Sequence, residues 1–320
     1  MQKLNVNIYV DLETQHFRMK IVFMGTPDFA VASLDALVKA KFDIVAVITA
    51  PDKPAGRGQK LNESAVKKYA VEHDIPVLQP EKLKNPEFLA QLKSFDADLQ
   101  VVVAFRMLPE VVWNMPKKGT INLHGSLLPQ YRGAAPINHA IINGEKESGV
   151  TTFFLTHEID TGDIIQSATT PIADDETTGE LHDKLMQIGA ELLVKTVKAI
   201  KEDNYQEQPQ PQSEVLKHAP KIFKDDCKID WNQPAQQVYN LIRGLSPYPT
   251  SFTFLNDKTL KVFKAELENK EPGIAAGGFL TDGKTYLKFA AKDGFIKLID
   301  IQYEGKKRML IEDFLRGMRL

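Results

Sequence analysis

The sequence predicts an α/β fold: a Rossmann-like domain with a mostly parallel sheet, followed by a small C-terminal β-barrel of the oligonucleotide-binding (OB) type. Up to Ile200, short apolar runs alternate with segments whose apolar residues recur at helical spacing, as in strand-helix-strand crossovers. A segment rich in Gln and Pro then interrupts this pattern. Beyond it, short β-rich runs are separated by turn pairs such as Asn256-Asp257 and Asp282-Gly283.

These changes in pattern divide the chain of 320 residues into four parts. A chain of this length can form two hydrophobic cores. The first strand-loop-helix unit begins at Met19, so the residues before it are interpreted as an extension. The expected parts are an N-terminal extension (1–18), an α/β domain (19–203), a linker (204–220) and an OB-like domain (221–320).

The strands expected in the first domain are short and nearly all apolar, which is typical of a parallel sheet covered on both faces. They span residues 21–24, 44–49, 76–78, 99–105, 120–124, 150–156 and 164–172. Helices are expected where apolar side chains recur every three or four residues. These segments are 29–38, 63–73, 87–94, a short one from Leu108, 136–143 and 178–200. The last is long and amphipathic, and it closes the domain.

The second domain is expected to contain one helix, at residues 238–243, and several strands. The strands are expected at 252–255, 260–263, 278–280, 286–289 and 295–302. Strands of this number and length fit a small OB-like barrel. Because one fold supports many functions, this prediction alone assigns none.

Composition excludes several classes of protein. The apolar fraction of 43% and the charged fraction of 26% are ordinary for a soluble protein. Neither a run of roughly 20 apolar residues nor the apolar core of a signal peptide is present, so a cytoplasmic location without a membrane partner is expected. The single cysteine, Cys227, cannot form an internal disulfide. The net charge of −2 gives no general affinity for nucleic acid, although residues 209–320 are mildly basic.

The polar pair Asn122 and His124 lies in the strand predicted at 120–124. Side chains two residues apart in a strand project from the same face, and Gly125-Ser126 then breaks the strand. An amide and an imidazole on one face can stabilise an oxygen that becomes negative during acyl transfer. Asp160, in the cluster Asp160-Thr-Gly-Asp163, could supply a carboxylate. A turn former beside a solvated or buried histidine is the alternative interpretation of the pair.

Other motifs are absent or open to two interpretations. No glycine-rich phosphate loop occurs, which disfavours a dinucleotide or triphosphate site. Residues 157–163 hold three acids and a histidine, but no His-Glu-x-x-His or cysteine pair accompanies them, so no metal is expected. The loop at 50–61 carries Lys53, Arg57 and Lys60 between Pro and Gly residues. It is either a solvated surface loop or a phosphate contact.

Two segments together carry a specific resemblance: Asn-Leu-His-Gly-Ser-Leu-Leu-Pro-x-Tyr-Arg-Gly-Ala-Ala-Pro at 122–136 and Asp-Thr-Gly-Asp at 160–163. They resemble the formyltetrahydrofolate-dependent formyltransferases. Matching stretches at 19–29, 54–58 and 242–249 extend the resemblance to essentially all of residues 19–320. The resemblance is strongest to members that act on initiator methionyl-tRNA. It implies transfer of the formyl group of 10-formyltetrahydrofolate to the methionine amino group, for translation initiation.

The resemblance also implies roles for individual positions. Asn122, His124 and Asp160 match the family's catalytic trio. The segment Ser126, Leu127, Leu128 and Pro129 matches its folate contact, and the loop with Lys53, Arg57 and Lys60 matches its tRNA-acceptor-binding loop. The C-terminal barrel matches its tRNA-binding domain, where we expect phosphate contacts from Lys306, Lys307 and Arg308. A monomer and no metal are expected.

One departure concerns the stretch after the third long strand. The usual Ala-Tyr-Gly is replaced by Ala104-Phe105-Arg106, which changes the expected shape of the pterin side of the pocket. Residues 1–18 have no counterpart in the family.

The implied chemistry gives each catalytic candidate a role. An uncharged amine attacks the formyl carbon, and Asn122 donates to the oxygen that becomes negative. His124 donates as well when protonated. Asp160 holds the imidazole and helps to accept the proton that leaves the amine.

Three alternatives remain at this point. Ser126, His124 and Asp160 could form a hydrolase triad, although Ser126 lacks the Gly-x-Ser-x-Gly turn that exposes such a nucleophile. The formyl acceptor could be a small amine or water. The chain could also be an RNA-binding protein without catalytic activity.

Overall fold

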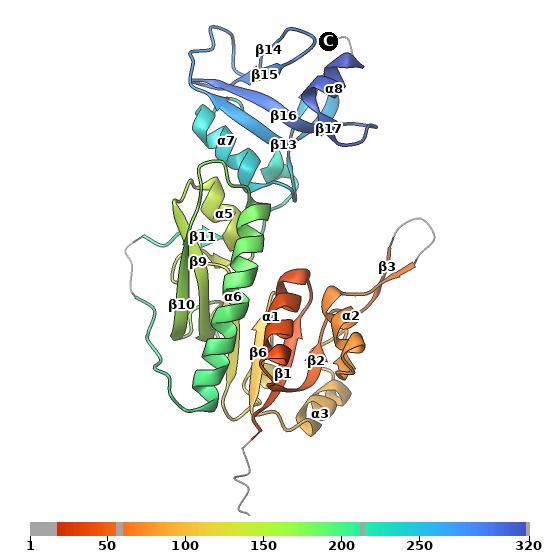
Figure 1. The fold of residues 1–320 in the computed structure, drawn as a ribbon, viewed down its shortest axis with the longest axis vertical. Helices are drawn as coiled ribbons and strands as arrows, with labels where there is room; N and C mark the ends of the chain where they lie inside the picture. Colours follow the sequence, from red (N-terminus) through yellow and green to blue (C-terminus); the bar gives the residue numbers. More distant parts are fainter. Residues whose placement is uncertain (1–17, 56–59, 212–214, 318–320) are drawn as a thin grey trace, which may run out of the picture.

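The computed structural model describes residues 18–55, 60–211 and 215–317 (Figure 1). Its first domain is built on a seven-stranded sheet in the order β10-β9-β7-β6-β1-β2-β5. The five strands from β5 to β7 in this order are parallel, and β9 and β10 run antiparallel at one edge. This confirms the predicted α/β fold. The strands are β1 (Lys20–Gly25), β2 (Asp43–Ile48), β5 (Val77–Leu78), β6 (Leu99–Val103), β7 (Thr120–His124), β9 (Glu147–Phe154) and β10 (Ile164–Pro171).

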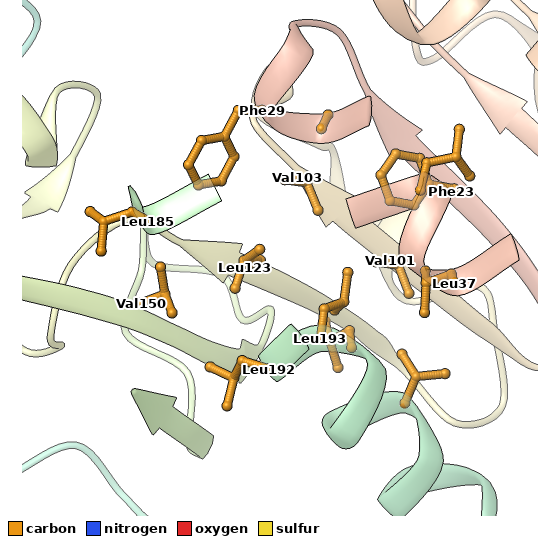
Figure 2. Close-up of a cluster of buried hydrophobic side chains, with 14 of the residues drawn as sticks. Phe23, Phe29, Leu37, Val101, Val103, Leu123, Val150, Leu185, Leu192 and Leu193 are labelled. Carbon is orange, nitrogen blue, oxygen red and sulfur yellow. The ribbon is translucent and has the colours of Figure 1, made fainter. Parts of the chain in front are cut away.

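Helices cover both faces of this sheet. The helices α1 (Asp28–Lys39) and α6 (Thr178–Lys201) pack together on one face, where apolar residues of β1, β6 and β7 meet them. Figure 2 shows Phe23, Val101 and Leu123 in this cluster beside Leu193 of α6. The opposite face packs against α3 (Pro86–Ser94) and α4 (Glu110–Trp113). The remaining helices of this domain are α2 (Ala65–Glu72) and α5 (Pro136–Ile142).

In the first domain, the clearest differences from the sequence prediction lie in three segments. The strand expected at 99–105 ends at Val103 because Ala104 has a φ of 47°, a left-handed conformation that ends an extended strand. The strand expected at 150–156 begins earlier, at Glu147, because its first residues pair with the end of β10. The segment at 50–61 was expected to be a loop, and it contains a short hairpin. The strands of that hairpin are β3 (Lys53–Ala55) and β4 (Lys60–Asn62).

The second domain is an antiparallel half-barrel, which agrees with the predicted OB-like class. Its strand order is β12-β13-β16-β15-β14, with β17 paired to β16. The strand expected at 260–263 is part of a strand of 11 residues, β13, whose pairing with β16 shifts register near Lys264. The elements are α7 (Ala235–Gly244), β12 (Ser251–Leu255), β13 (Lys258–Glu268), β14 (Phe279–Thr281), β15 (Leu287–Ala290), β16 (Phe295–Tyr303), β17 (Met309–Leu310) and α8 (Ile311–Arg316).

The two domains meet where α7 packs on α5, above the sheet in Figure 1. The carbonyl of Gly244 accepts hydrogen bonds from Asn138 Nδ2 at 2.8 Å and from Thr178 Oγ1 at 2.7 Å. Arg243 is buried and donates from Nη1 to the carbonyl of Glu176 at 3.1 Å. Two side chains of the first domain therefore bond one carbonyl at the end of α7, and a side chain of α7 bonds a carbonyl of the first domain, which fixes the half-barrel against the α/β domain. In the described part of the chain, no helix is both long and apolar enough to cross a membrane.

The close approach at Gly244 gives a test of this domain contact. A Cβ atom at Gly244 would lie 2.5 Å from Cγ1 of Ile142 and 3.0 Å from its backbone nitrogen. Gly244→Ala should therefore lower the free energy of unfolding by about 1–3 kcal/mol, the usual effect of overpacking. Urea denaturation would measure it. Gly317→Ala is the matched control, because its Cβ would meet no atom closer than 3.8 Å. Equal stability of the two variants would contradict the packed interface.

Candidate active site

The strand β7 presents apolar and polar side chains to opposite faces of the sheet. Ile121 and Leu123 belong to the core beneath α1 and α6. Asn122 and His124 alternate with them and therefore project to the other face. Asn122 pairs in register with Val102, a residue of the core on the α3 side. The polar pair expected from the sequence thus shares one face at the end of β7.

The imidazole of His124 is buried and oriented by backbone. Its Nε2 lies 2.9 Å from the carbonyl oxygen of Tyr131. Because a carbonyl can only accept, Nε2 carries the hydrogen of this bond. Its Nδ1 faces Oδ2 of Asp160 at 3.8 Å, which is within ion-pair distance but too long for a hydrogen bond. Such contacts in unliganded sites often tighten when substrate binds.

Asp160 reaches His124 from the loop between β9 and β10. Its Oδ2 accepts a hydrogen bond from the Gly133 amide at 2.9 Å. Among the described residues, none donates to its Oδ1, so that oxygen is available to accept a proton. The backbone of Asp160 is left-handed, with a φ of 55°. The loop also requires the nearby glycine, because a Cβ at Gly162 would lie 1.7 Å from the carbonyl oxygen of Phe154.

The side-chain amide of Asn122 is partly exposed. Within the described parts of the chain, it makes no hydrogen bond. An amide without a protein partner, on the same face as His124, is free to donate to a substrate oxygen. The structure therefore brings His124 and Asp160 into contact and leaves Asn122 uncommitted beside them.

The residues 126–129 form a tight, largely buried turn after β7. Ser126 is 1% exposed, and its Oγ donates to the carbonyl of Gln130 at 2.7 Å. Thr151 Oγ1 donates to the Ser126 carbonyl and accepts from the Leu128 amide. Leu128 and Pro129 are buried, and Leu127 is partly exposed. A buried hydroxyl already bonded to a carbonyl is not an activated nucleophile, which disfavours a Ser-His-Asp hydrolase. The assignment of this turn to folate stays a prediction.

Arg106, the departure from the family pattern, ties two loops together. Its guanidinium donates to the carbonyl of Glu81 at 2.9 Å and to that of Pro80. The group also lies over the Phe105 ring, 5.6 Å from its centroid. Partial burial lowers the pKa of Arg106. The side chain thus joins the segment after β5 to the segment after β6, at the end of the sheet that carries His124.

The sequence did not predict a polar cluster around Tyr131, the residue whose carbonyl bonds His124. Tyr131 donates to the carboxylate of Glu145, which also pairs with Lys217. Burial and the bond to Glu145 raise the pKa of Tyr131. The pKa of Glu145 is lowered, because the bonds from Lys217 and Tyr131 outweigh its burial. These residues are far apart in sequence, so no local pattern connects them.

The basic residues proposed for tRNA lie in two places. Lys53 is exposed on β3, Lys60 belongs to β4, and Arg57 lies outside the described residues. The carboxylate of Asp52 anchors the base of this hairpin by bonds to Lys67 and Gln79. In the barrel, Lys306 and Lys307 are exposed in the turn between β16 and β17. Arg308 is engaged with Asp300, at 2.7 Å, and with the Phe263 ring. Figure 1 shows β3 and β17 on the same side of the molecule.

No group of three or more potential metal ligands occurs among the residues that the structure describes. His157 lies 3.6 Å from Glu110, but it is exposed and makes no larger cluster. The expectation that no metal takes part stays a prediction.

Comparisons with known families match both parts of the chain. The family described as "Formyl transferase" matches residues 19–197. The family described as "Formyl transferase, C-terminal domain" matches residues 221–319. A methionyl-tRNA formyltransferase of Bacteroides fragilis is 54% identical over 94% of this chain and 96% of its own length. One of Flavobacterium johnsoniae is 50% identical over the same shares.

Solved structures share the fold at lower identity. A sugar 3N-formyl transferase crystallised with dTDP and 5-N-formyl-THF has a TM-score of 0.65 at 23% identity, over 91% of this chain and 99% of its own. The protein HypX of Aquifex aeolicus, in complex with tetrahydrofolic acid, has a TM-score of 0.64 at 16% identity. That match covers 93% of this chain and 47% of HypX.

Proposed function

The chain belongs to the formyl transferase family, and we propose that it transfers the formyl group of 10-formyltetrahydrofolate to the amino group of methionine on initiator methionyl-tRNA. The product would serve translation initiation. The observation that carries the proposal is the buried contact between His124 and Asp160 beside the uncommitted amide of Asn122. Relatives that share about half of their residues over nearly the whole chain support the choice of acceptor.

The geometry supports a catalytic role for each of the three side chains. When the amine attacks the formyl carbon, its carbonyl oxygen becomes negative, and Asn122 and protonated His124 are the groups that can donate to it. The bond to Tyr131 holds the imidazole in one orientation. The carboxylate of Asp160 stabilises the charged ring, and its Oδ1 can accept the proton lost by the amine. The bond between the formyl carbon and the folate nitrogen then breaks, and that nitrogen takes up a proton as tetrahydrofolate leaves.

The chain offers two surfaces for the folate. The turn of Ser126, Leu127, Leu128 and Pro129 lies immediately after β7 and is largely apolar, and its Leu127 is partly exposed. The loops joined by Arg106 lie at the same end of the sheet. An apolar wall with a few fixed backbone groups is the usual environment of a bound planar ligand. We propose that the pterin ring lies between these two walls.

We propose that the tRNA lies across the hairpin strands with Lys53 and Lys60 and the turn with Lys306 and Lys307. Both segments project on one side of the molecule (Figure 1). Arg57, which lies outside the described residues, stays a candidate from the sequence. Arg308 is included as a candidate, although its guanidinium is already bonded to Asp300. The three catalytic side chains come from one chain, so a monomer suffices. A tRNA acceptor and the lack of a membrane-spanning helix among the described residues support a cytoplasmic location.

A small amine is the second candidate acceptor, because the sugar formyl transferase shares this fold. A likeness at 23% identity supports only the fold, and one fold hosts several functions. The relatives with 50% and 54% identity favour tRNA over a sugar.

The acceptor can be identified directly. Purified protein would be offered 10-formyltetrahydrofolate labelled in the formyl group, with methionyl-tRNA, free methionine or an amino sugar nucleotide in parallel. We expect only methionyl-tRNA to take up label. Labelling of a small amine at a comparable rate would refute the proposed acceptor.

Asn122 provides a test of the catalytic assignment. Asn122→Ala should reduce turnover roughly a hundredfold, the scale of one lost oxyanion donor, with little change in the KM of either substrate. Steady-state formylation of methionyl-tRNA would measure this, and a thermal unfolding curve would verify that the variant folds. Near-normal turnover would show that the amide does not act on the reacting oxygen.

The two barrel lysines test the tRNA surface. Lys306→Glu with Lys307→Glu should raise the KM for methionyl-tRNA and leave the KM for the folate unchanged. The slope of the logarithm of tRNA affinity against the logarithm of salt concentration should become less steep by about two, because about one phosphate contact is lost per lysine. Lys270→Glu with Lys292→Glu is the charge-matched control, since both lysines are exposed elsewhere on the barrel. Equal effects of the two pairs would mean that net charge, rather than this turn, governs tRNA binding.

A further inference from the structure

The segment that joins the two domains lies against the catalytic loops. After α6, the chain runs back along the side of the first domain to β11 (His218–Ala219), beside α5 (Figure 1). The backbone of Gln208 pairs with Ile164 in both directions, at 2.8 and 2.9 Å. The strand β11 pairs with β8 (Arg132–Gly133), which directly follows Tyr131. We refer to the described residues 208–211 and 215–219 as the strap.

One side chain of the strap contacts the loop of Asp160. The amide nitrogen of Gln210 donates to the carbonyl oxygen of Asp160 at 2.8 Å and to that of Gly162 at 2.9 Å. The amide oxygen of Gln210 accepts from Nε of Arg132 at 3.1 Å and from its Nη2 at 2.6 Å. Two donors and two acceptor sites are the full capacity of a carboxamide, so this side chain is completely committed.

The bonds from Gln210 end at the strained part of the Asp160 loop. Asp160 is held in the left-handed region, which costs energy for a residue other than glycine and persists only when its surroundings impose it. Gln210 fixes the backbone of Asp160 through its carbonyl, and Gly133 fixes the carboxylate through Oδ2. Arg132 joins these two supports, because it precedes Gly133 in β8 and bonds to Gln210.

We propose that Gln210 is a positioning residue for formyl transfer, which holds the carboxylate of Asp160 at the Nδ1 side of His124. Gln210 itself has no role in contacting substrate. The inference rests on the proposed function, because it assumes that Asp160 takes part in the reaction. It gives Gln210 a part in the active site, while the rest of the strap connects the two domains.

The strap does not depend on Gln210 for its attachment. Gln208 binds Ile164 through backbone alone, and the Tyr131 amide donates to the carbonyl of Lys217 at 2.6 Å. Lys217 also pairs with Glu145. Loss of the Gln210 amide should therefore leave the strap in place and release only the loop of Asp160. Its effect should appear in turnover rather than in folding.

Two substitutions separate the bonds that Gln210 donates from those it accepts. Gln210→Met keeps the length of the side chain and removes every hydrogen bond, whereas Gln210→Glu still accepts from Arg132 but cannot donate to Asp160. We expect both variants to reduce kcat on the order of ten- to a hundredfold, the effect of a small misplacement of a catalytic group, with KM for both substrates nearly unchanged.

Gln208→Ala is the matched control. Gln208 is exposed on the same strap, and among the described residues its side chain makes no hydrogen bond, while its backbone pairs with Ile164. This variant should keep wild-type turnover. Wild-type kcat in Gln210→Glu would overturn the proposal, because the donated bonds would then have no influence on Asp160.

A double-mutant cycle with Asp160→Asn distinguishes positioning from a general structural role. If Gln210 acts through Asp160, Gln210→Glu should slow the wild-type enzyme but add almost nothing in the Asp160→Asn background. Additive losses would show that Gln210 acts by another route and would refute the inference. Two other results would contradict the assignments on which this inference rests. Wild-type turnover in Asp160→Asn would show that Asp160 has no catalytic role. A wild-type protein that does not formylate methionyl-tRNA would refute the proposed function.

Discussion

The hydrogen bond from His124 to the Tyr131 carbonyl is the interaction on which the candidate site depends. It holds Nε2 against the carbonyl and leaves Nδ1 on the side of Asp160. The same bond joins the end of β7 to the chain seven residues later and closes the turn that contains Ser126. Thr151 supports the turn from β9 by bonding the Ser126 carbonyl and the Leu128 amide. One backbone carbonyl thus sets both the orientation of the imidazole and the shape of the adjoining wall.

The position of the second domain follows from how the chain returns to this wall. The strap runs past Ile164, Asp160 and Tyr131 before it enters the half-barrel. The end of α7 is then bonded to the first domain through Asn138 and Thr178. A substrate that contacts both the half-barrel and the β3–β4 hairpin would therefore bind two domains whose relative position is fixed by the contacts at the end of α7. Such pre-organisation lowers the ordering cost of binding a large substrate.

Local patterns in the sequence were sufficient for most elements and for half of the site. Apolar runs predicted the central strands because both faces of this sheet are covered. The period of two placed Asn122 and His124 on one face. The approach of Asp160 depends instead on a left-handed residue in a loop of another strand and on a carboxamide in a segment whose composition indicates only a linker. Contacts between residues that are distant in sequence leave no periodic signal, so no local pattern could identify Gln210.

The departure at Arg106 replaces the family's glycine with a side chain that bonds a neighbouring loop. A glycine in that position leaves the backbone free, whereas the guanidinium of Arg106 bonds the carbonyls of Pro80 and Glu81. Two carbonyl groups in the segment after β5 thereby accept hydrogen bonds from a side chain in the segment after β6. These two parallel strands are separated in the sheet by β1 and β2, so the bonds link segments that the sheet itself does not join. Since ligands of such sheets bind beyond the carboxyl ends of the strands, this link stiffens the edge against which a planar ring would rest. The change is thus compatible with the family's chemistry, because the side chain adds bonds between two loops and leaves the contact between His124 and Asp160 in place.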